Sequence, residues 1–305
     1  MARSRRKVSR AAVFFALLSL VLGVLLYRAT RPPGAGRAPA GKPLPTRAPS
    51  PVRREWTPRA ADARRAPTLP APGIPPPATP GAPSGPPRIA ILIDDLGNDR
   101  AAVDRIAAWS WPVSTAILPA LPGSGETARE LERSGKEILL HLPMEPLGFP
   151  RVRPGPGVVL RSQSDQEIAD TLTADLDTVP GVVGVNNHMG SAATADARVM
   201  RAVTRVLARR GLFFVDSRTT DATVARDAAR ESHVRSASRR VFLDDVATES
   251  AVEASLQGLF ARARSEGSAI GIGHPHPATL AVLDRELPKL AERGVRLVRV
   301  SELVE

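Results

Sequence analysis

The chain has 305 residues, 43% of them hydrophobic, with no cysteine and a formal net charge of +11 at pH 7. Residues 1–87 hold 15 Lys and Arg against two acidic residues, whereas residues 88–305 hold 27 against 29. The part that can fold therefore lacks the positive excess that nucleic-acid binding requires, so we expect no nucleic-acid partner. The missing cysteines exclude disulfides, cysteine-ligated zinc and a cysteine nucleophile.

The first predicted element is a membrane-spanning helix. Residues 1–10 are rich in Arg and Lys, and the 17 residues 11–27 contain no charge. A helix of that length extends about 25 Å, at the short end of what spans a bilayer. We interpret residues 1–30 as a cytoplasmic basic stub and an uncleaved signal anchor in the inner membrane, with the rest of the chain in the periplasm or extracytoplasmic space. Secretion after signal cleavage is the alternative.

Residues 31–87 predict a disordered linker. They hold 18 of the 30 prolines, with Gly, Ala, Ser and Arg making up most of the remainder. Such a segment buries too little apolar surface to offset the entropy lost on ordering. We therefore expect an extended, solvated spacer, with binding of its arginines to anionic lipid or cell-wall polymer as the alternative.

From residue 88 onward, short apolar runs alternate with amphipathic stretches. The predicted strands are residues 89–93, 113–118, 137–141, 182–185, 212–215, 241–243, 269–272 and 295–300. The predicted helices are residues 99–109, 125–134, 165–179, 196–210, 248–265 and 278–293. This alternation favours parallel strands with helical crossovers. Residues 88–305 are thus predicted to form one α/β domain, either a (β/α) barrel, complete or incomplete, or a doubly wound sheet.

Polar residues gather at the carboxyl ends of six predicted strands. They occur at residues 94–98 (DDLGN), 141–145 (HLPME), 186–191 (NNHMGS), 216–220 (DSRTT), 244–245 (DD) and 273–277 (GHPHP). In a parallel α/β fold these ends lie on one face, where active sites are built. Their shared position predicts a single functional site, although the acids at 244 and 245 are equally suited to capping a helix.

The residue types at these ends indicate a metal-dependent hydrolase. Asp94 and Asp95 are adjacent carboxylates, which need a cation or a proton to coexist. With His141 and His188 they offer oxygen and nitrogen ligands without sulfur, a set that suits a divalent ion, most commonly zinc. Hydrolysis also needs a base and a proton donor, for which Asp94 and one of the two histidines in residues 273–277 are the candidates.

The motifs also carry a family resemblance. The IDDLG turn at residues 93–97 is similar to the TFDDG motif of polysaccharide deacetylases, carbohydrate esterases with a NodB-type deformed (β/α) barrel. The divergent, YibQ-like branch is matched more closely, because IDDLG, HLPMEP, GVNNHMGS, FVDSRT and GHPH stand in the expected order within residues 88–303. The resemblance implies a deformed barrel of about seven parallel strands.

The resemblance also implies roles for individual residues. It makes Asp94 the catalytic base, Asp95 a metal ligand and His141 the first histidine of the family's H-x-x-x-H ligand motif. Glu145 stands where the second histidine belongs, so the third ligand is either Glu145 or His188. We favour His188, because its small and polar neighbours leave room for a metal.

The proton donor of the family is a late histidine after a strand, which implies His274. His276 is expected to cap the last long helix or to line the substrate pocket, and Pro277 to begin that helix. The family's Arg–Pro motif is not evident, and Arg218 is the candidate for its orienting role. The residues expected to contact substrate are Glu145, Asn187, Asp216, Arg218 and His276.

The implied activity is removal of N-acetyl or similar acyl groups from a cell-envelope polysaccharide. Two other functions fit the sequence. The altered second ligand favours a catalytically silent barrel that binds the cell wall or has a regulatory role. A tethered scaffold, in which the Arg- and Pro-rich segment is the working part, is the other.

Overall fold

The structure is a computed structural model that describes residues 85–305. The predicted membrane anchor (residues 1–30) and nearly all of the predicted linker (residues 31–87) lie outside these residues and stay predictions. Within the described part of the chain, no helix is both long and apolar enough to cross a bilayer.

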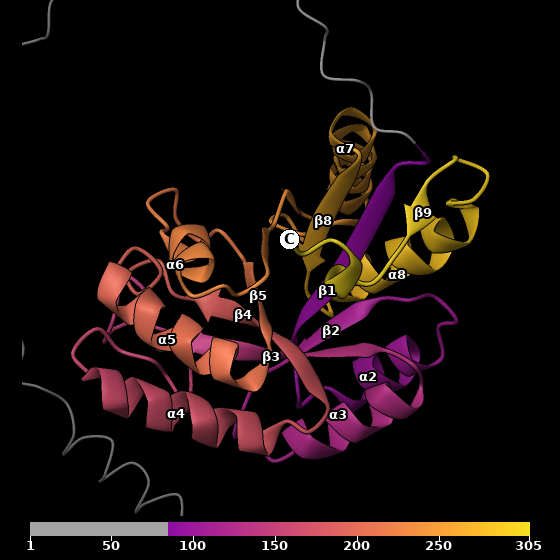
Figure 1. The fold of residues 1–305 in the computed structure, drawn as a ribbon. Coiled ribbons are helices and arrows are strands. Elements are labelled where there is room, and N and C mark those ends of the chain that lie inside the picture. The colour runs from indigo at the N-terminus through magenta and orange to yellow at the C-terminus, as the bar shows by residue number, and fades with distance from the viewer. Residues whose placement is uncertain (1–84) are drawn as a thin grey trace, which may run out of the picture. The chain divides into compact units, whose positions relative to one another are not determined.

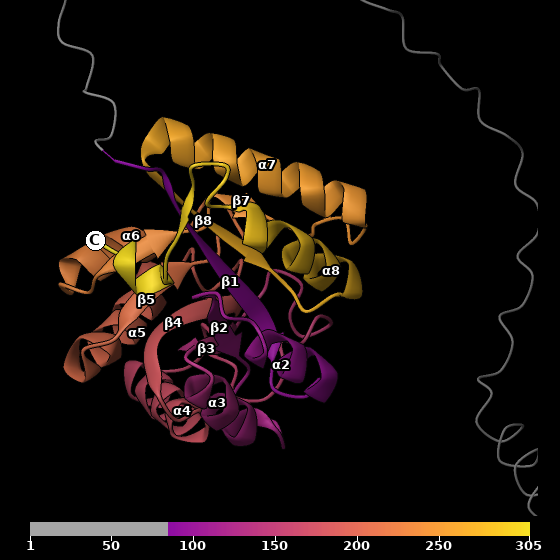
Figure 2. The same cartoon turned by 90° about the vertical axis from the view of Figure 1, so that its right-hand side faces the viewer.

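The described residues contain a parallel sheet of nine strands. The strands are β1 (Arg88–Leu96), β2 (Ser114–Ile117), β3 (Glu137–Met144), β4 (Val182–Met189), β5 (Phe213–Asp216), β6 (Ser236–Ser238), β7 (Val241–Phe242), β8 (Ser268–Gly273) and β9 (Arg296–Leu297). Their order is β6-β5-β4-β3-β2-β1-β8-β7, with β9 also paired to β1. The sheet curls, and the helices cover its outer face (Figures 1 and 2).

The two edges of the curled sheet are linked by two residues. β6 and β7 stand at opposite ends of the strand order, yet only Arg239 and Arg240 separate them. The Arg239 amide donates to Asp216 O of β5, and the Arg240 amide donates to Ile270 O of β8. This consecutive order, with its edges joined, confirms the expected deformed barrel and excludes the doubly wound sheet, whose strand order reverses at a switch point.

Seven α-helices lie in the described residues. They are α2 (Arg100–Ala107), α3 (Ser124–Arg133), α4 (Asp165–Thr178), α5 (Ala197–Arg210), α6 (Ala225–Glu231), α7 (Glu249–Glu266) and α8 (Pro277–Glu286). The hydrophobic periodicity of the sequence did not predict α6 and β6, which are too short to show a repeat. It also extended α8 too far, because the chain tightens to a 3₁₀ turn at Leu287–Lys289, where Pro288 cannot continue an α-helix.

The central residues of the long strands are buried on both faces. In β1, Ile89, Ile91 and Ile93 pack outward against the helices, while Ala90 and Leu92 point into the barrel. The inward cluster is made of Ala90, Leu92, Ala116, Leu139, Phe213, Val215, Ile270, Ile272, Val298 and Val300. Because side chains alternate along a strand, the next inward position at each carboxyl end must lie above this cluster.

Asp175 of α4 is a buried carboxylate that belongs to none of the strand-end motifs. It is 3% exposed, packs against Gly157, and its Oδ2 has no hydrogen-bond partner in the described residues. Burial raises the pKa of Asp175 to about 7. The folded protein therefore binds this proton more tightly than the unfolded chain does.

We expect the stability of the protein to fall as pH rises from about 4 to 7 and to stay lower above 7, because ionising Asp175 costs more in the folded state. Asp175→Asn should remove this slope and raise the free energy of unfolding at pH 8 by up to about 4 kcal/mol. Urea denaturation at pH 5 and pH 8 measures both effects. The control is Asp177→Asn, an exposed carboxylate of the same helix; equal slopes in wild type and Asp175→Asn would contradict the assignment.

Candidate active site and metal centre

The inward positions at the strand ends carry the polar residues of the site. They are Asp94 from β1, His141 from β3, Asn186 and His188 from β4, Ser217 after β5 and His274 after β8. Asp94, His141, Ser217 and His274 continue the two-residue alternation of the inward cluster below them. Asn186 and His188 continue the alternation of Gly184, whose α-carbon faces Phe213 of that cluster. All of them except Asn186 line a cavity of about 890 Å³.

A backbone irregularity lets two successive residues of β1 face this cavity. Neighbours in a strand normally point to opposite sides. Here the pairing of β1 with β2 shifts register between Ile93 and Leu96, and Asp95 has a left-handed φ of 58°. Of five non-glycine residues with positive φ in the described chain, three line the cavity: Asp95, Met189 and Arg218. Such strained positions concentrate at functional sites.

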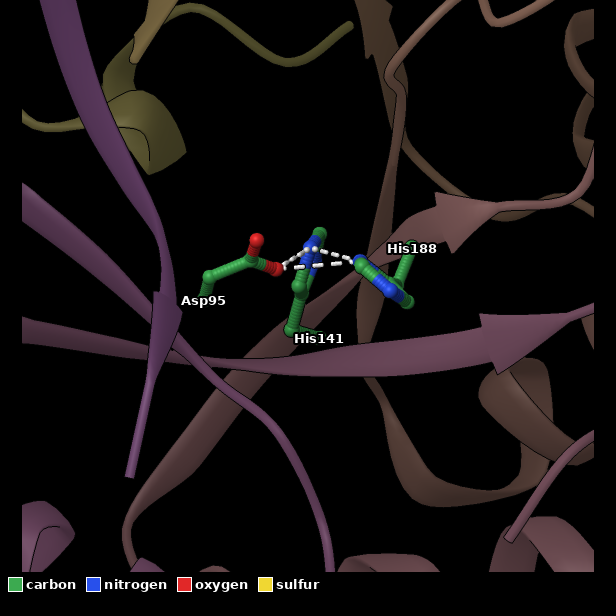
Figure 3. A group of neighbouring side chains, drawn as sticks. All are labelled: Asp95, His141 and His188. Atoms are coloured by element: carbon green, nitrogen blue, oxygen red, sulfur yellow. Dashed lines mark hydrogen bonds and ion pairs between the residues drawn. The ribbon is translucent and has the colours of Figure 1, made fainter. Parts of the chain in front are cut away.

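Asp95, His141 and His188 form a compact triangle of ligand atoms (Figure 3). Asp95 Oδ1 lies 3.1 Å from His141 Nε2 and 3.0 Å from His188 Nδ1, and the two ring nitrogens are 3.1 Å apart. Ligand atoms bound to one zinc ion at about 2.1 Å lie roughly 3.0–3.4 Å from one another. Asp95 Oδ1 is also buried and lacks a well-aligned hydrogen bond. The three residues therefore fit a divalent ion.

Asn186 fixes the ring of His141 and the carboxylate of Asp94 at once. In the sheet His141 and Asn186 are direct neighbours in register. The Asn186 amide nitrogen donates to Asp94 Oδ1 at 2.9 Å and Oδ2 at 3.1 Å, so its carbonyl oxygen faces His141 Nδ1 at 2.9 Å. Nδ1 must then carry the proton, which leaves the Nε2 lone pair aimed at the triangle. Histidine ligands of metals are commonly oriented in this way.

The pKa shifts show that the cluster attracts positive charge. Burial raises the pKa of Asp94, and this outweighs the opposing effects of His141, His274 and Asn186. Burial also raises the pKa of Asp95, but its contacts with the two histidines of the triangle outweigh burial and lower it overall. Burial lowers the pKa of His141, and the charges of the two aspartates more than reverse this. A proton or a metal ion would neutralise the negative charge of the two carboxylates.

His274 is held on the other side of the cavity by Asp244. Asp244 Oδ2 accepts from the His274 amide at 2.6 Å and from Thr279 Oγ1 at 2.7 Å, and its Oδ1 faces His274 Nδ1 at 3.0 Å. Nδ1 therefore carries a proton, and Nε2 points toward Asp95 Oδ2, 3.7 Å away. Burial lowers the pKa of His274, but Asp244 and Asp94 outweigh burial and raise it.

The sequence model of the divergent polysaccharide deacetylase family matches residues 91–304 of the chain. The chain belongs to this family. It is 38% identical to a Haemophilus influenzae protein, over 71% of this chain and 76% of the relative, and 38% identical to Escherichia coli YibQ, over 71% and 67%. A crystal structure of an Agrobacterium tumefaciens C58 protein matches with a TM-score of 0.70 and 26% identity, covering 74% of this chain and 92% of that one.

In this member of the family, Glu145 lies away from the triangle. Both of its carboxylate oxygens bind Arg161: Oε2 accepts from the Arg161 amide at 2.7 Å, and Oε1 accepts from Arg161 Nε at 3.0 Å. Glu145 is not among the residues that line the cavity. His276 is not among them either; it is the N-cap residue of α8, with Pro277 following at N1 as expected.

The other predicted substrate contacts divide between the cavity and its support. Arg218 lines the cavity and is exposed. Asn187 also lines it, but its side chain accepts from the Ser217 amide and donates to Met189 O, so it holds the loops together. Asp216 has the opposite strand parity to Val215 and turns away, where it accepts from the Arg218 amide and from Thr223 Oγ1.

Sequence reasoning omitted Asn186 and Ser217, and left Asp244 undecided between capping and function. A signal for Ser217 was present, because the two-residue alternation through Phe213 and Val215 of β5 leads to it. For Asn186 the signal was its position two residues before His188 in the same strand. The partnership of Asp244 with His274 has no such signal, since it joins β7 to β8 across 30 residues.

If the triangle is the metal site of this family member, His188→Ala should lower zinc affinity by at least about 100-fold, because one of three protein ligands is lost. Glu145→Gln should leave zinc affinity nearly unchanged. Competition with a chromophoric chelator measures both constants. The opposite pattern, with Glu145→Gln losing the metal and His188→Ala keeping it, would move the third ligand to Glu145.

Proposed function

We propose that this chain is a metal-dependent hydrolase that removes N-acetyl or similar acyl groups from a cell-envelope polysaccharide. Its membership of the divergent polysaccharide deacetylases supports the reaction class. The observation that carries the proposal is the convergence of three parts at one cavity: the triangle of Asp95, His141 and His188, the carboxylate of Asp94, and the imidazole of His274. Zinc is the ion we expect, because the ligands are two histidines and one carboxylate.

The residues of the chain divide the chemistry between two sides of the cavity. A divalent ion at the triangle would acidify water and polarise the acyl carbonyl. Asp94 Oδ2, 3.6 Å from His141 Nε2, faces the same place and can take the proton of the attacking water. Its raised pKa suits a general base. Asn186 keeps the carboxylate in position throughout.

Proton donation to the leaving amine falls to His274. Its raised pKa keeps Nε2 protonated at neutral pH more fully than in a free imidazole. Asp244 Oδ1 holds Nδ1–H and stabilises the imidazolium, while its Oδ2 accepts from the His274 amide and so fixes the backbone that carries the ring. The amine would thus leave in its neutral form.

The two histidines of residues 273–277 provide the test. We expect His274→Ala to lower kcat for acetate release by on the order of 100-fold or more, because it removes the proton donor, while zinc remains bound. His276→Ala is the matched control, since it lies two residues away, occupies the N-cap position of α8 without a capping hydrogen bond from its side chain, and does not line the cavity. Acetate released from N-acetylated chito-oligosaccharides and peptidoglycan fragments, with zinc content measured in parallel, reports both quantities.

Zinc bound at the triangle without acetate release from any of these substrates would favour the alternative, a silent barrel that binds the cell wall or regulates another protein. Loss of activity in His276→Ala but not in His274→Ala would exchange the roles of the two residues. As for location, we propose that the domain works in the periplasm or extracytoplasmic space, held to the inner membrane by the uncharged residues 11–27. The Arg- and Lys-rich residues 1–10 before them support this orientation.

A further inference from the structure

Arg239 is a half-buried cation of the cavity that forms no ion pair within the described residues. Burial lowers its pKa, and this outweighs the opposing charges of Asp216, Asp94 and Asp245, which lie beyond ion-pair distance. Its Nε donates to Ser217 O at 2.7 Å and its Nη2 to Arg218 O at 2.9 Å, so two backbone carbonyls fix the guanidinium in place. Within residues 85–305 no carboxylate lies within ion-pair distance of it, and its Nη1 has no hydrogen-bond acceptor. Taking a cation out of water without a counter-ion is costly.

Phe242 sets this guanidinium close to the reacting groups. The Arg239 guanidinium carbon lies 4.9 Å from the centre of the Phe242 ring, and the same ring lies 5.3 Å from the centre of the His274 ring. All three residues line the cavity. The guanidinium carbon and the centre of the His274 ring therefore lie at most about 10 Å apart.

A second guanidinium strengthens the positive potential on this wall. Arg218 also lines the cavity, and its left-handed backbone is held by the bond from its amide to Asp216. Its ion pair with Asp221 is solvent-exposed and so of little strength. Asp245 lines the cavity as well, but it is exposed and forms no ion pair with either arginine in the described chain.

We propose that Arg239 binds a carboxylate of the glycan, so that the substrate is an acidic polysaccharide whose carboxylate lies within one or two sugar rings of the acyl group. This rests on the proposed function for the acyl group, and on the unpaired guanidinium for the carboxylate. A carboxylate fits because its two oxygens match the planar arginine fork, and a charge-assisted pair of this kind discriminates by about tenfold or more. Arg218 adds long-range attraction.

The test is equilibrium binding of two disaccharides to the zinc-loaded full chain by calorimetry. N-acetylglucosaminyl-N-acetylmuramic acid differs from di-N-acetylchitobiose by a lactyl ether with a carboxylate. We expect wild type to bind the acidic disaccharide about tenfold or more tightly, and its methyl ester like chitobiose. Arg239→Gln should lose the preference yet keep its affinity for chitobiose. Arg240→Gln, which changes the adjacent arginine that pairs with Glu266 outside the cavity, should keep the preference.

Equal binding of acid, ester and chitobiose by wild type would overturn the proposal without any variant. Equal loss of both ligands in Arg239→Gln would also overturn it, because the arginine would then only support the cavity wall. Acetate release is measured on the same samples. Acetate release without tighter binding of the acidic disaccharide would contradict the carboxylate site and leave the proposed function intact. Tighter binding of the acidic disaccharide without acetate release would support the carboxylate site and contradict the proposed hydrolase activity.

Discussion

Asp94→Asn should lower kcat for acetate release by on the order of 1,000-fold while the protein still binds zinc with nearly unchanged affinity. Asparagine keeps the volume of the side chain and can accept the hydrogen bond from Asn186, but it cannot take a proton from water. In wild type the rate should fall as pH is lowered through the pKa of Asp94. Since burial raises that pKa, the acidic limb should lie above the usual range of an aspartate.

The control is Asp245→Asn, which neutralises another carboxylate of the same cavity. This residue is exposed and makes no contact with the triangle, so kcat should change little. Steady-state rates across pH, with zinc content of each sample, separate the two variants. Full activity in Asp94→Asn would refute its role as the base, and loss of zinc would make Asp94 a ligand instead.

Asn186→Leu should impair metal binding and catalysis together. The apolar side chain of similar size leaves Asp94 buried without its amide donor and His141 Nδ1 without its acceptor. We expect zinc affinity to fall by about 10- to 100-fold, as is usual when the partner of a ligating histidine is lost. The free energy of unfolding should fall by about 2–4 kcal/mol, because a buried charge loses its hydrogen bonds.

The pH profile distinguishes this positioning role from simple loss of stability. The hydrogen bond from Asn186 lowers the pKa of Asp94, so its removal should move the acidic limb of the residual activity to higher pH. A profile measured at saturating zinc reports the shift. Thr204→Val, which removes a buried hydroxyl from α5 that does not line the cavity, is the stability control. It should lower stability without moving the limb.

The sequence by itself determined the fold class and the kinds of side chain that make up the site. Alternating runs predicted parallel strands with helical crossovers, because strands buried on both faces are continuously apolar. The motifs at the strand ends predicted that Asp94, Asp95, His141, His188 and His274 would share one face, and the structure brings these five together. Such predictions need only local periodicity and the rule that parallel strands end on one side.

Only the tertiary structure decided the register between the strands and the face of the sheet on which each side chain lies. The sequence favoured His188 over Glu145 only through the small and polar neighbours of His188, because the geometric reason depends on how β3 and β4 pair. The observed register sets His141 beside Asn186, so His188, two residues on, lies on the same face, while Glu145 is past the end of β3. The alternation of β5 likewise turned Asp216 away and Ser217 inward.

The irregular positions were the least predictable. Asp95 reaches the cavity beside Asp94 only because its backbone is left-handed at a shift of register in β1. Asp244 reaches His274 because β7 pairs with β8, although the two residues are 30 apart in the chain. Arg239 comes to line the cavity because the link between β6 and β7 carries the chain from one edge of the sheet to the other. Both placements depend on the curled sheet as a whole, which no local window of sequence contains.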